Sequence, residues 1–175
     1  MLCRRVTFSY YTPNLRKIKG DSTRTIKVIN NLYQGNLEDA IRVSKTKEVD
    51  AIVWLSQEIP HELSHDSMIP IVHIPLVDGM NEDLRVVLAF DTISFLILDD
   101  KTLVACRSGI SRSPTIIVAY LAVYKYTSPN VMKNFEKAFL KIHKLNPNYQ
   151  PEPHLLESVR NTVKKHFGND TKEVK

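Results

Sequence analysis

The 175-residue sequence is poor in cysteine, with only Cys3 and Cys106. Two cysteines cannot form the disulfide framework on which small secreted domains depend, so we expect a reducing, cytoplasmic setting. Long apolar runs are also missing. The longest, residues 93–98, falls far short of a membrane span, and the N-terminus has no apolar stretch typical of a signal peptide. These absences argue against secreted and membrane-spanning classes.

Apolar residues make up 43% of the chain, which is enough for one domain with a hydrophobic core. The net charge of +5 is concentrated at the start, where residues 1–28 contain seven basic side chains and one acidic residue, Asp21. We expect a basic, partly packed arm over residues 1–25, a folded domain over 26–167 and a short tail over 168–175. The arm either contacts an anionic partner (a phosphorylated protein, nucleic acid or lipid surface) or is a solvated terminus.

Short β-branched runs alternate with helical patterns after the arm. Strands are predicted within residues 25–35, 49–56, 71–77 and 102–106. Helices are predicted within residues 37–44, 81–98, 113–124, 128–145 and 153–168. In the helix over 128–145, Ser128 is the predicted cap and Pro129 the first helical residue. This alternation predicts an α/β fold with a central, mostly parallel sheet flanked by helices.

The segment "LVACRSGISRSPT" places a cysteine and an arginine around a glycine, between a buried strand and a buried helix. Amides of such a loop converge at the helix N-terminus and favour an anion. Gly109 permits a positive φ or a close backbone approach, and Arg112 can bind two phosphate oxygens in a fork. A thiolate at Cys106 would then face a bound phosphate. The alternative, a structural cysteine beside an incidental arginine, does not explain Gly109 or Ser113-Pro114.

"ACRSGISRSPTIIVAYL" resembles the signature of the dual-specificity protein phosphatases, a branch of the cysteine-dependent protein tyrosine phosphatase superfamily. "VINNLYQGNLEDA", "IPLVDGMNEDL" and "LNPNYQPEPHLLE" resemble the family's opening strand and turn, its general-acid loop and its last helix. The likeness covers roughly residues 26–165. It implies that the domain over 26–167 is a phosphatase domain that hydrolyses phosphotyrosine and phosphoserine/threonine without a metal or other cofactor, with phosphorylated proteins as its partners.

The resemblance also implies a role for each matching residue. Cys106 attacks phosphorus and carries the phosphoryl group, while Arg112 holds the phosphate oxygens. Asp78 protonates the leaving oxygen and then activates water, and Ser113 hydrogen-bonds the cysteine sulfur. The amides from Arg107 to Arg112 complete the cradle, so the implied substrate-binding residues are Arg107, Ser108, Gly109, Ile110 and Ser111. The side chain of Arg107 is either a contact for a second acidic group or a solvated surface charge.

Two acids compete with Asp78 for the general-acid role: Glu82 and Asp83. Both lie at the start of a predicted helix, where acidic residues have a structural explanation. Asp78 follows a buried strand and precedes Gly79 on a segment that is able to swing. We therefore assign the acid to Asp78.

Ala105 departs from the family pattern, which has histidine before the cysteine. Alanine removes a side-chain contact but leaves the amides, the helix dipole and Arg112, so we expect a slower enzyme that is still active. A histidine at 105 is expected to favour the thiolate with little change in stability. A catalytically weakened phosphate-binding protein is the alternative that Ala105 suggests, and a phosphoinositide or RNA 5′-phosphatase with the same site is another.

"HELSH", residues 61–65, fits the H-E-x-x-H zinc pattern. Pro60 and Pro70 bracket it within barely ten residues, too short for the long helix of a metalloprotease. His73 is nearby, but no third ligand is clearly placed. We expect a solvent-facing turn or short helix and no metal site.

Overall fold

The computed structural model describes residues 25–168. Five strands form one sheet in the order β1-β2-β5-β3-β4. The first two, β1 (Ile26–Ile29) and β2 (Leu32–Gly35), are antiparallel. The other neighbours are parallel: β2 with β5 (Thr102–Ala105), β5 with β3 (Ala51–Trp54), and β3 with β4 (Ile71–His73). The predicted α/β fold with a mostly parallel sheet is confirmed.

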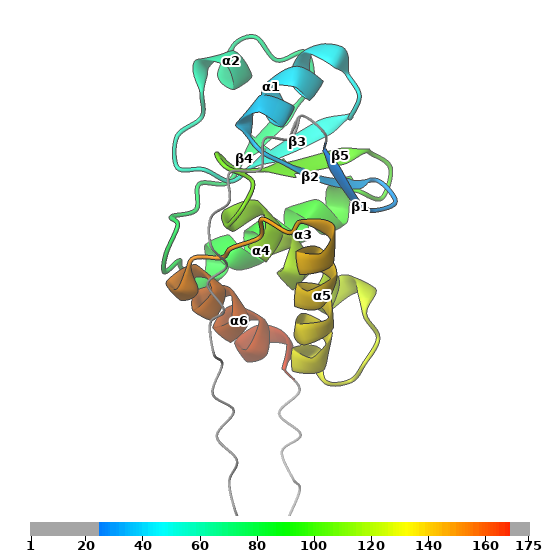
Figure 1. The fold of residues 1–175 in the computed structure, drawn as a ribbon, viewed down its shortest axis with the longest axis vertical. Helices are drawn as coiled ribbons and strands as arrows, with labels where there is room; N and C mark the ends of the chain where they lie inside the picture. The colour runs from blue at the N-terminus through cyan, green and yellow to red at the C-terminus, as the bar shows by residue number, and fades with distance from the viewer. Residues whose placement is uncertain (1–24, 169–175) are drawn as a thin grey trace, which may run out of the picture.

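Two groups of helices cover the two faces of this sheet (Figure 1). On one face lie α1 (Leu37–Thr46) and the short α2 (His61–Ser64). On the other lie α3 (Asp83–Leu96), α4 (Arg112–Tyr120) with its π-helical extension η1 (Leu121–Lys125), α5 (Val131–Leu145) and α6 (Pro153–Phe167). None of the helices in residues 25–168 is long and apolar enough to cross a membrane.

Each face of the sheet has its own hydrophobic core. Trp54, Leu103 and Ala105 pack with α1 residues on one face. Val53, Val104 and Cys106 pack with α3, α4, α5 and α6 on the other. Since neighbouring residues of a strand point to opposite faces, Ala105 and Cys106 belong to different cores. Helix α4 is buried along its whole length after Arg112, as its nearly uniform apolar sequence predicts.

Local sequence explains several element boundaries. Asn31 adopts a positive φ of 61° in the two-residue turn between β1 and β2, a conformation that asparagine tolerates. Asn36 caps α1 in a capping box with Asp39. The predicted start of α5 is wrong by two residues: the helix begins at Val131, because the Asn130 side chain accepts from the amides of Met132 and Lys133.

Candidate active site

The site residues gather at the carboxyl edge of the parallel strands. Asn36 and α1 follow β2, Ser56 follows β3, Asp78 lies beyond β4, and Cys106 follows β5. Parallel strands bring their carboxyl ends to one edge, where ligands bind in open α/β sheets. The loop over 106–111 connects β5 to α4, as the sequence predicts.

Cys106 is fully buried at the base of this loop, and it is a free thiol. Its Sγ lies 3.3 Å from Oγ of Ser113, which is also fully buried. The same Ser113 hydroxyl donates to the carbonyl of Gly35 at 3.4 Å. Ser113 is therefore held against the sulfur by the end of β2.

Hydrogen bonds from outside the loop hold its carbonyl groups. The Gly109 carbonyl accepts from Gln34 Nε2 at 2.7 Å and from Asn146 Nδ2 at 3.1 Å. Asn146 Nδ2 also donates to Gln34 Oε1 at 3.2 Å, and both side chains are buried. The amides of Leu37 and Gln150 donate to the carbonyls of residues 107 and 110. A carbonyl turned outward leaves the amide of the same peptide unit pointing inward.

Gly109 is the one position of this loop that requires glycine. Its φ is +70°, in the left-handed region that disfavours other residues. A Cβ there would lie 3.1 Å from both the Asn36 Cβ and the Gly35 carbonyl oxygen. The glycine thus allows the loop to turn directly against the β2–α1 junction.

The expected cradle of amides from Arg107 to Arg112 needs one correction. The Arg107 amide donates to Ser56 Oγ at 2.9 Å, so it supports the loop from the β3 side. Within the described residues, the amides of Ser108, Gly109, Ile110, Ser111 and Arg112 have no protein acceptor in the hydrogen-bond network. These five amides stand at the N-terminus of α4, where backbone donors attract an anion.

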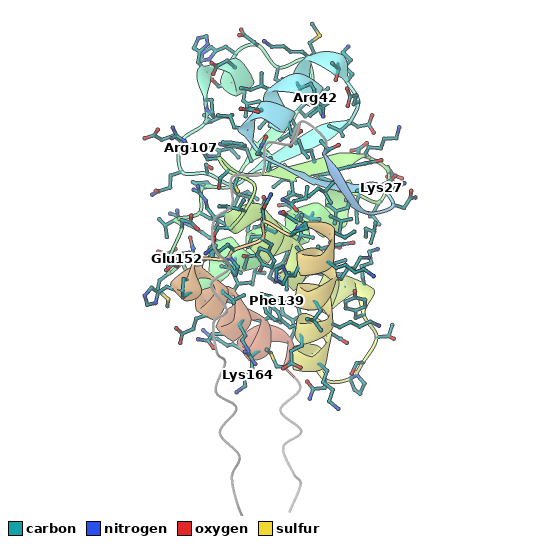
Figure 2. The ribbon with its side chains drawn as sticks, viewed as in Figure 1. Lys27, Arg42, Arg107, Phe139, Glu152 and Lys164 are labelled. Atoms are coloured by element: carbon teal, nitrogen blue, oxygen red, sulfur yellow. The ribbon has the colours of Figure 1, made fainter. Side chains whose placement is uncertain are left out.

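Arg112 begins α4 and is half-buried. Its Nη1 donates to the carbonyl of Leu76 at 3.3 Å. Its Nε is buried and has no hydrogen-bond partner among the described residues. A buried guanidinium nitrogen without an acceptor is costly, and a bound phosphate oxygen would satisfy it. The side chains of Arg107 and Ser108 are exposed, and Arg107 lies at the surface (Figure 2).

Asp78 is tied to the loop by Ser111. The Ser111 hydroxyl donates to Asp78 Oδ1 at 2.6 Å and accepts from the Glu152 amide at 3.1 Å. The segment that carries Asp78 is held by Asn81, which exchanges hydrogen bonds with the backbone of Val77 and donates to the Gly79 carbonyl. The Asp78 carboxylate therefore lies against the loop that carries Cys106.

The two competing acids have other partners. Glu82 is exposed and pairs weakly with Arg85 at 3.9 Å. Asp83 accepts from Lys165 Nζ at 2.6 Å and from Thr162 Oγ1 at 2.7 Å. These hydrogen bonds, led by that of Lys165, lower the pKa of Asp83 to about 2. Asp83 thus links the start of α3 to α6. Its role is structural, as expected for an acidic residue at the start of a helix.

A cavity of about 340 Å³ lies on the outer side of the loop, between β2, α1 and the segment after α5. Gln34, Asn36, Asp39, Ser108, Gly109 and Asn146 are among its lining residues. The hydrogen bonds that hold Gly109 therefore run beside this cavity.

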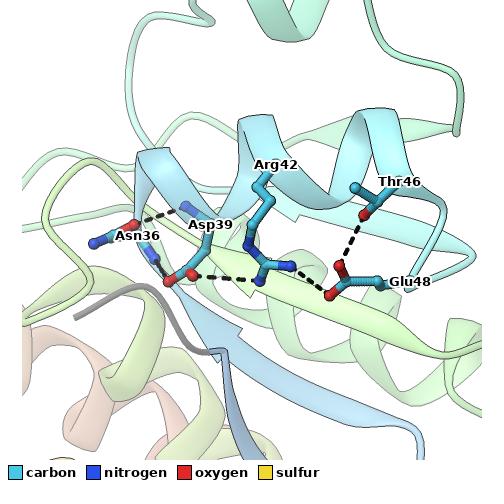
Figure 3. A network of polar contacts seen from close by, with 5 residues as sticks. All are labelled: Asn36, Asp39, Arg42, Thr46 and Glu48. Carbon is cyan, nitrogen blue, oxygen red and sulfur yellow. Dashed lines mark hydrogen bonds and ion pairs between the residues drawn. The ribbon is translucent and has the colours of Figure 1, made fainter. Parts of the chain in front are cut away.

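Asp39 connects this cavity to a polar network along α1 (Figure 3). Its Oδ2 accepts from the Asn36 amide at 3.2 Å. Its Oδ1 lies 3.6 Å from Arg42 Nη2, an ion-pair distance too long for a hydrogen bond. Burial raises the pKa of the Asp39 carboxyl above its usual value, against the opposing effects of Asn36 and Arg42. Arg42 is itself bound to Glu48, which also accepts from Thr46.

The "HELSH" segment forms a four-residue helix with a turn after it, as expected. The rings of His61 and His65 stack with centroids 4.3 Å apart. His73 Nε2 donates to the carbonyl of Ser56 at 2.8 Å. His73 therefore helps to hold Ser56, whose hydroxyl accepts from the Arg107 amide of the loop. Residues 25–168 contain no group of three or more histidine, cysteine, aspartate or glutamate side chains that could hold a metal ion.

A buried thiol at the base of a loop of amides without protein acceptors, with an arginine at the start of the next helix, defines a class of protein: a cysteine-dependent phosphatase. Residues 32–161 match the model of the dual specificity phosphatase catalytic domain. The dual specificity protein phosphatase OPG106 of Variola virus is 30% identical over 152 residues, with 79% of this chain and 85% of that protein covered. The chain belongs to the dual specificity phosphatase family, and it is a protein phosphatase hydrolysing phosphoric monoesters.

Solved structures agree on the fold. Human DUSP28 superposes with a TM-score of 0.65 at 18% identity, covering 81% of this chain and 93% of that one. A leucine rich repeat and phosphatase domain containing protein from Entamoeba histolytica gives 0.64 at 18% identity, covering 82% and 93%. The matches do not favour a phosphoinositide phosphatase, an RNA 5′-phosphatase or a binding protein without catalysis.

Four supporting residues were missed by the sequence analysis: Gln34, Ser56, Asn81 and Asn146. Gln34 carried a usable signal, because a polar residue within an apolar strand run needs a buried partner. The other three lie in loops, and only the folded chain brings them to the site.

Proposed function

We propose that Cys106 is the nucleophile of a two-step hydrolysis. Its thiolate attacks the phosphorus of a phosphate monoester, the P–O bond to the leaving group breaks, and the phosphoryl group is transferred to sulfur. Water then attacks the cysteinyl-phosphate, the S–P bond breaks, and inorganic phosphate is released. Support comes from one arrangement above all: Sγ lies at the base of a loop whose carbonyls are bound from outside, so its amides point toward the sulfur.

The surrounding residues take their roles from the same arrangement. The Arg112 side chain and the amides from Ser108 to Arg112 hold the phosphate oxygens as charge develops. Asp78, positioned by Ser111, gives its proton to the leaving oxygen in the first step and takes one from water in the second. The Ser113 hydroxyl lies 3.3 Å from the sulfur, and in the second step it turns its proton from the Gly35 carbonyl to the sulfur as the sulfur leaves.

We infer phosphorylated proteins as the substrates, with phosphotyrosine and phosphoserine/threonine both accepted. Arg107 is exposed beside the nucleophile and is proposed to contact an acidic residue or second phosphate of the substrate. The basic arm over 1–25 lies almost entirely outside the described residues, and its proposed partner is an anionic surface. A cytoplasmic location is proposed because the catalytic thiol works only in its reduced form.

Trapping the intermediate tests this function. The protein is incubated with a ³²P-labelled phosphotyrosine peptide in a strong chelator, quenched in acid and digested. We expect label on the peptide containing Cys106 and continued release of phosphate. Activity that disappears with the chelator and returns with zinc, without label on Cys106, would overturn the proposal.

A further inference from the structure

Helix α3 exposes large apolar side chains along one face. Leu84 is 76% exposed, Leu88 52% and Phe95 75%, and Leu98, just after the helix, is 70% exposed. The amide of Leu98 donates to the carbonyl of Phe95, so the chain continues its turn there. The opposite face, with Val86, Ala89, Phe90 and Ile93, is buried in the core. Helix α3 thus has two apolar faces, and within residues 25–168 only the face toward the core is covered.

This exposed set, Leu84, Leu88, Phe95 and Leu98, is here called the α3 stripe. Single exposed apolar residues are normal on a protein surface, but a contiguous group marks an interaction site. The four positions share one side of the helix because their spacings are close to whole turns of 3.6 residues.

The four residues of the α3 stripe are spaced almost symmetrically about Asp91. Leu84 and Leu98 lie seven positions before and after Asp91, and Leu88 and Phe95 lie three before and four after. A two-fold axis near Asp91 that packs two α3 helices antiparallel would place Leu84 opposite Leu98 and Leu88 opposite Phe95. It would also bring together the two half-buried Asp91 side chains, each of which accepts a hydrogen bond from Tyr124 of its own copy. The apolar positions of this face are therefore complementary to themselves, as a two-fold interface requires.

Charges at the ends of the stripe agree with this register. Arg85 and Glu82 are exposed at its start, and Asp99 and Lys101 are exposed at its end. The antiparallel arrangement brings Arg85 of one copy toward Asp99 of the other, and Glu82 toward Lys101. A parallel arrangement would instead place Arg85 of one copy beside Arg85 of the other, and Asp99 beside Asp99, so that like charges meet.

We propose that a second copy of this chain covers the α3 stripe, forming an antiparallel two-fold dimer. Helix α3 lies on the sheet face away from α1, and the stripe contains none of the residues assigned to catalysis. The proposal therefore stands or falls independently of the proposed mechanism.

Sedimentation equilibrium of the full chain tests the dimer. The mass should rise with concentration from 20.1 kDa toward twice that value. Phe95→Glu should weaken association at least tenfold, because it places a charge in the centre of the interface. Leu140→Glu is the matched control, since Leu140 is 67% exposed on α5 outside the stripe, and it should leave association unchanged.

A charge exchange tests the antiparallel register. Arg85→Asp and Asp99→Arg should each weaken the dimer, and the double variant should restore it. A full chain that stays monomeric at all concentrations would overturn the proposal, whether or not removing residues 1–24 then produces a dimer. Equal loss of association in Phe95→Glu and Leu140→Glu, or a double variant no better than the singles, would overturn it as well.

Discussion

The Ser111 hydroxyl joins the general acid to the phosphate loop by a 2.6 Å hydrogen bond to Asp78 Oδ1. Ser111 also accepts from the amide of Glu152, the capping residue of α6, at 3.1 Å. One hydroxyl therefore connects three segments that are far apart in the sequence. Because a hydroxyl can donate to only one acceptor, its donation to Asp78 fixes where the carboxylate lies relative to Cys106.

Ser111→Ala removes this connection while leaving the loop amides in place. We expect kcat to fall about tenfold for phosphate esters with poor leaving groups, because Asp78 loses the donor that positions it and positioned proton transfer is typically worth about 10²–10⁴-fold. Activated aryl phosphates, which leave without a proton, should lose much less. Ser111→Thr keeps the hydroxyl and should recover most of the rate. Equal losses across leaving groups would show that Ser111 acts on the loop rather than on Asp78.

Cys106→Ser should abolish turnover but keep phosphate binding, because most donors of the cradle are backbone amides. Arg112→Lys should reduce both rate and affinity, since lysine cannot offer the two-pronged contact of a guanidinium. Calorimetric titration with inorganic phosphate measures binding, and release of an aryl alcohol measures turnover. Near-normal turnover in Cys106→Ser would place the nucleophile elsewhere, with Cys3 the only other thiol.

The layers of this fold were predictable because the apolar patterns are strong. The strand at 102–105 and the helix at 112–120 are apolar almost throughout. Segments that are apolar on all sides are buried at the centre of the domain. Capping details were less predictable. Ser128, Pro129 and Asn130 all suit a helix start, and only the folded chain shows that Asn130 reaches two amides.

The candidate site likewise has residues that the sequence reveals and residues that it does not. Cys106, Gly109 and Arg112 are close in the sequence, so their spacing alone indicates an anion site. Gln34 and Asn146 lie 112 positions apart, and neither has a local pattern that reveals their contact with Gly109. Long-range polar pairs of this kind depend on tertiary packing, which a single sequence does not encode in any short motif.

Gln34→Met tests whether the outer hydrogen bonds orient the loop. Methionine preserves length but removes the donor to the Gly109 carbonyl, so the amides that face the phosphate are held less firmly. We expect kcat to fall about 10–100-fold, as small displacements of positioning groups often cause. Asn148→Ser, in the wall of the same cavity, is the control and should have little effect. Full activity in Gln34→Met would mean that Asn146 and the backbone contacts suffice.

Stability should depend on pH through Asp83. Its pKa in the folded protein is lowered from 3.8 to about 2, chiefly by Lys165 and then Thr162. A lowered carboxyl pKa stabilises the fold above about pH 3.8, and this contribution disappears as pH falls toward 2. Asp83→Asn should therefore lower the urea midpoint at pH 6, with a gap from wild type that shrinks below pH 4. Glu82→Gln, next to it and exposed, should show a smaller gap.

Ala105 lies in a tighter environment than its sequence position suggests. It is paired in register with Trp54 on β3, and both are buried in the core on the α1 side of the sheet. The Trp54 indole also donates to the Glu58 carbonyl at 2.8 Å, which fixes the ring in place. A histidine at 105 would therefore enter a filled core, on the face opposite to Cys106. The expectation that it would fit with little change in stability is revised.

Ala105→His should lower the free energy of unfolding by about 1–3 kcal/mol, the usual cost of overpacking. Activity should not rise, because Gln34, Asn146 and Ser56 already hold the loop from outside. Trp54→Phe makes room beside residue 105, so the double variant should be more stable than the sum of the two single changes predicts. Urea unfolding of all four proteins completes the cycle. Strict additivity, or faster turnover in Ala105→His at unchanged stability, would show that histidine finds space near the sulfur after all.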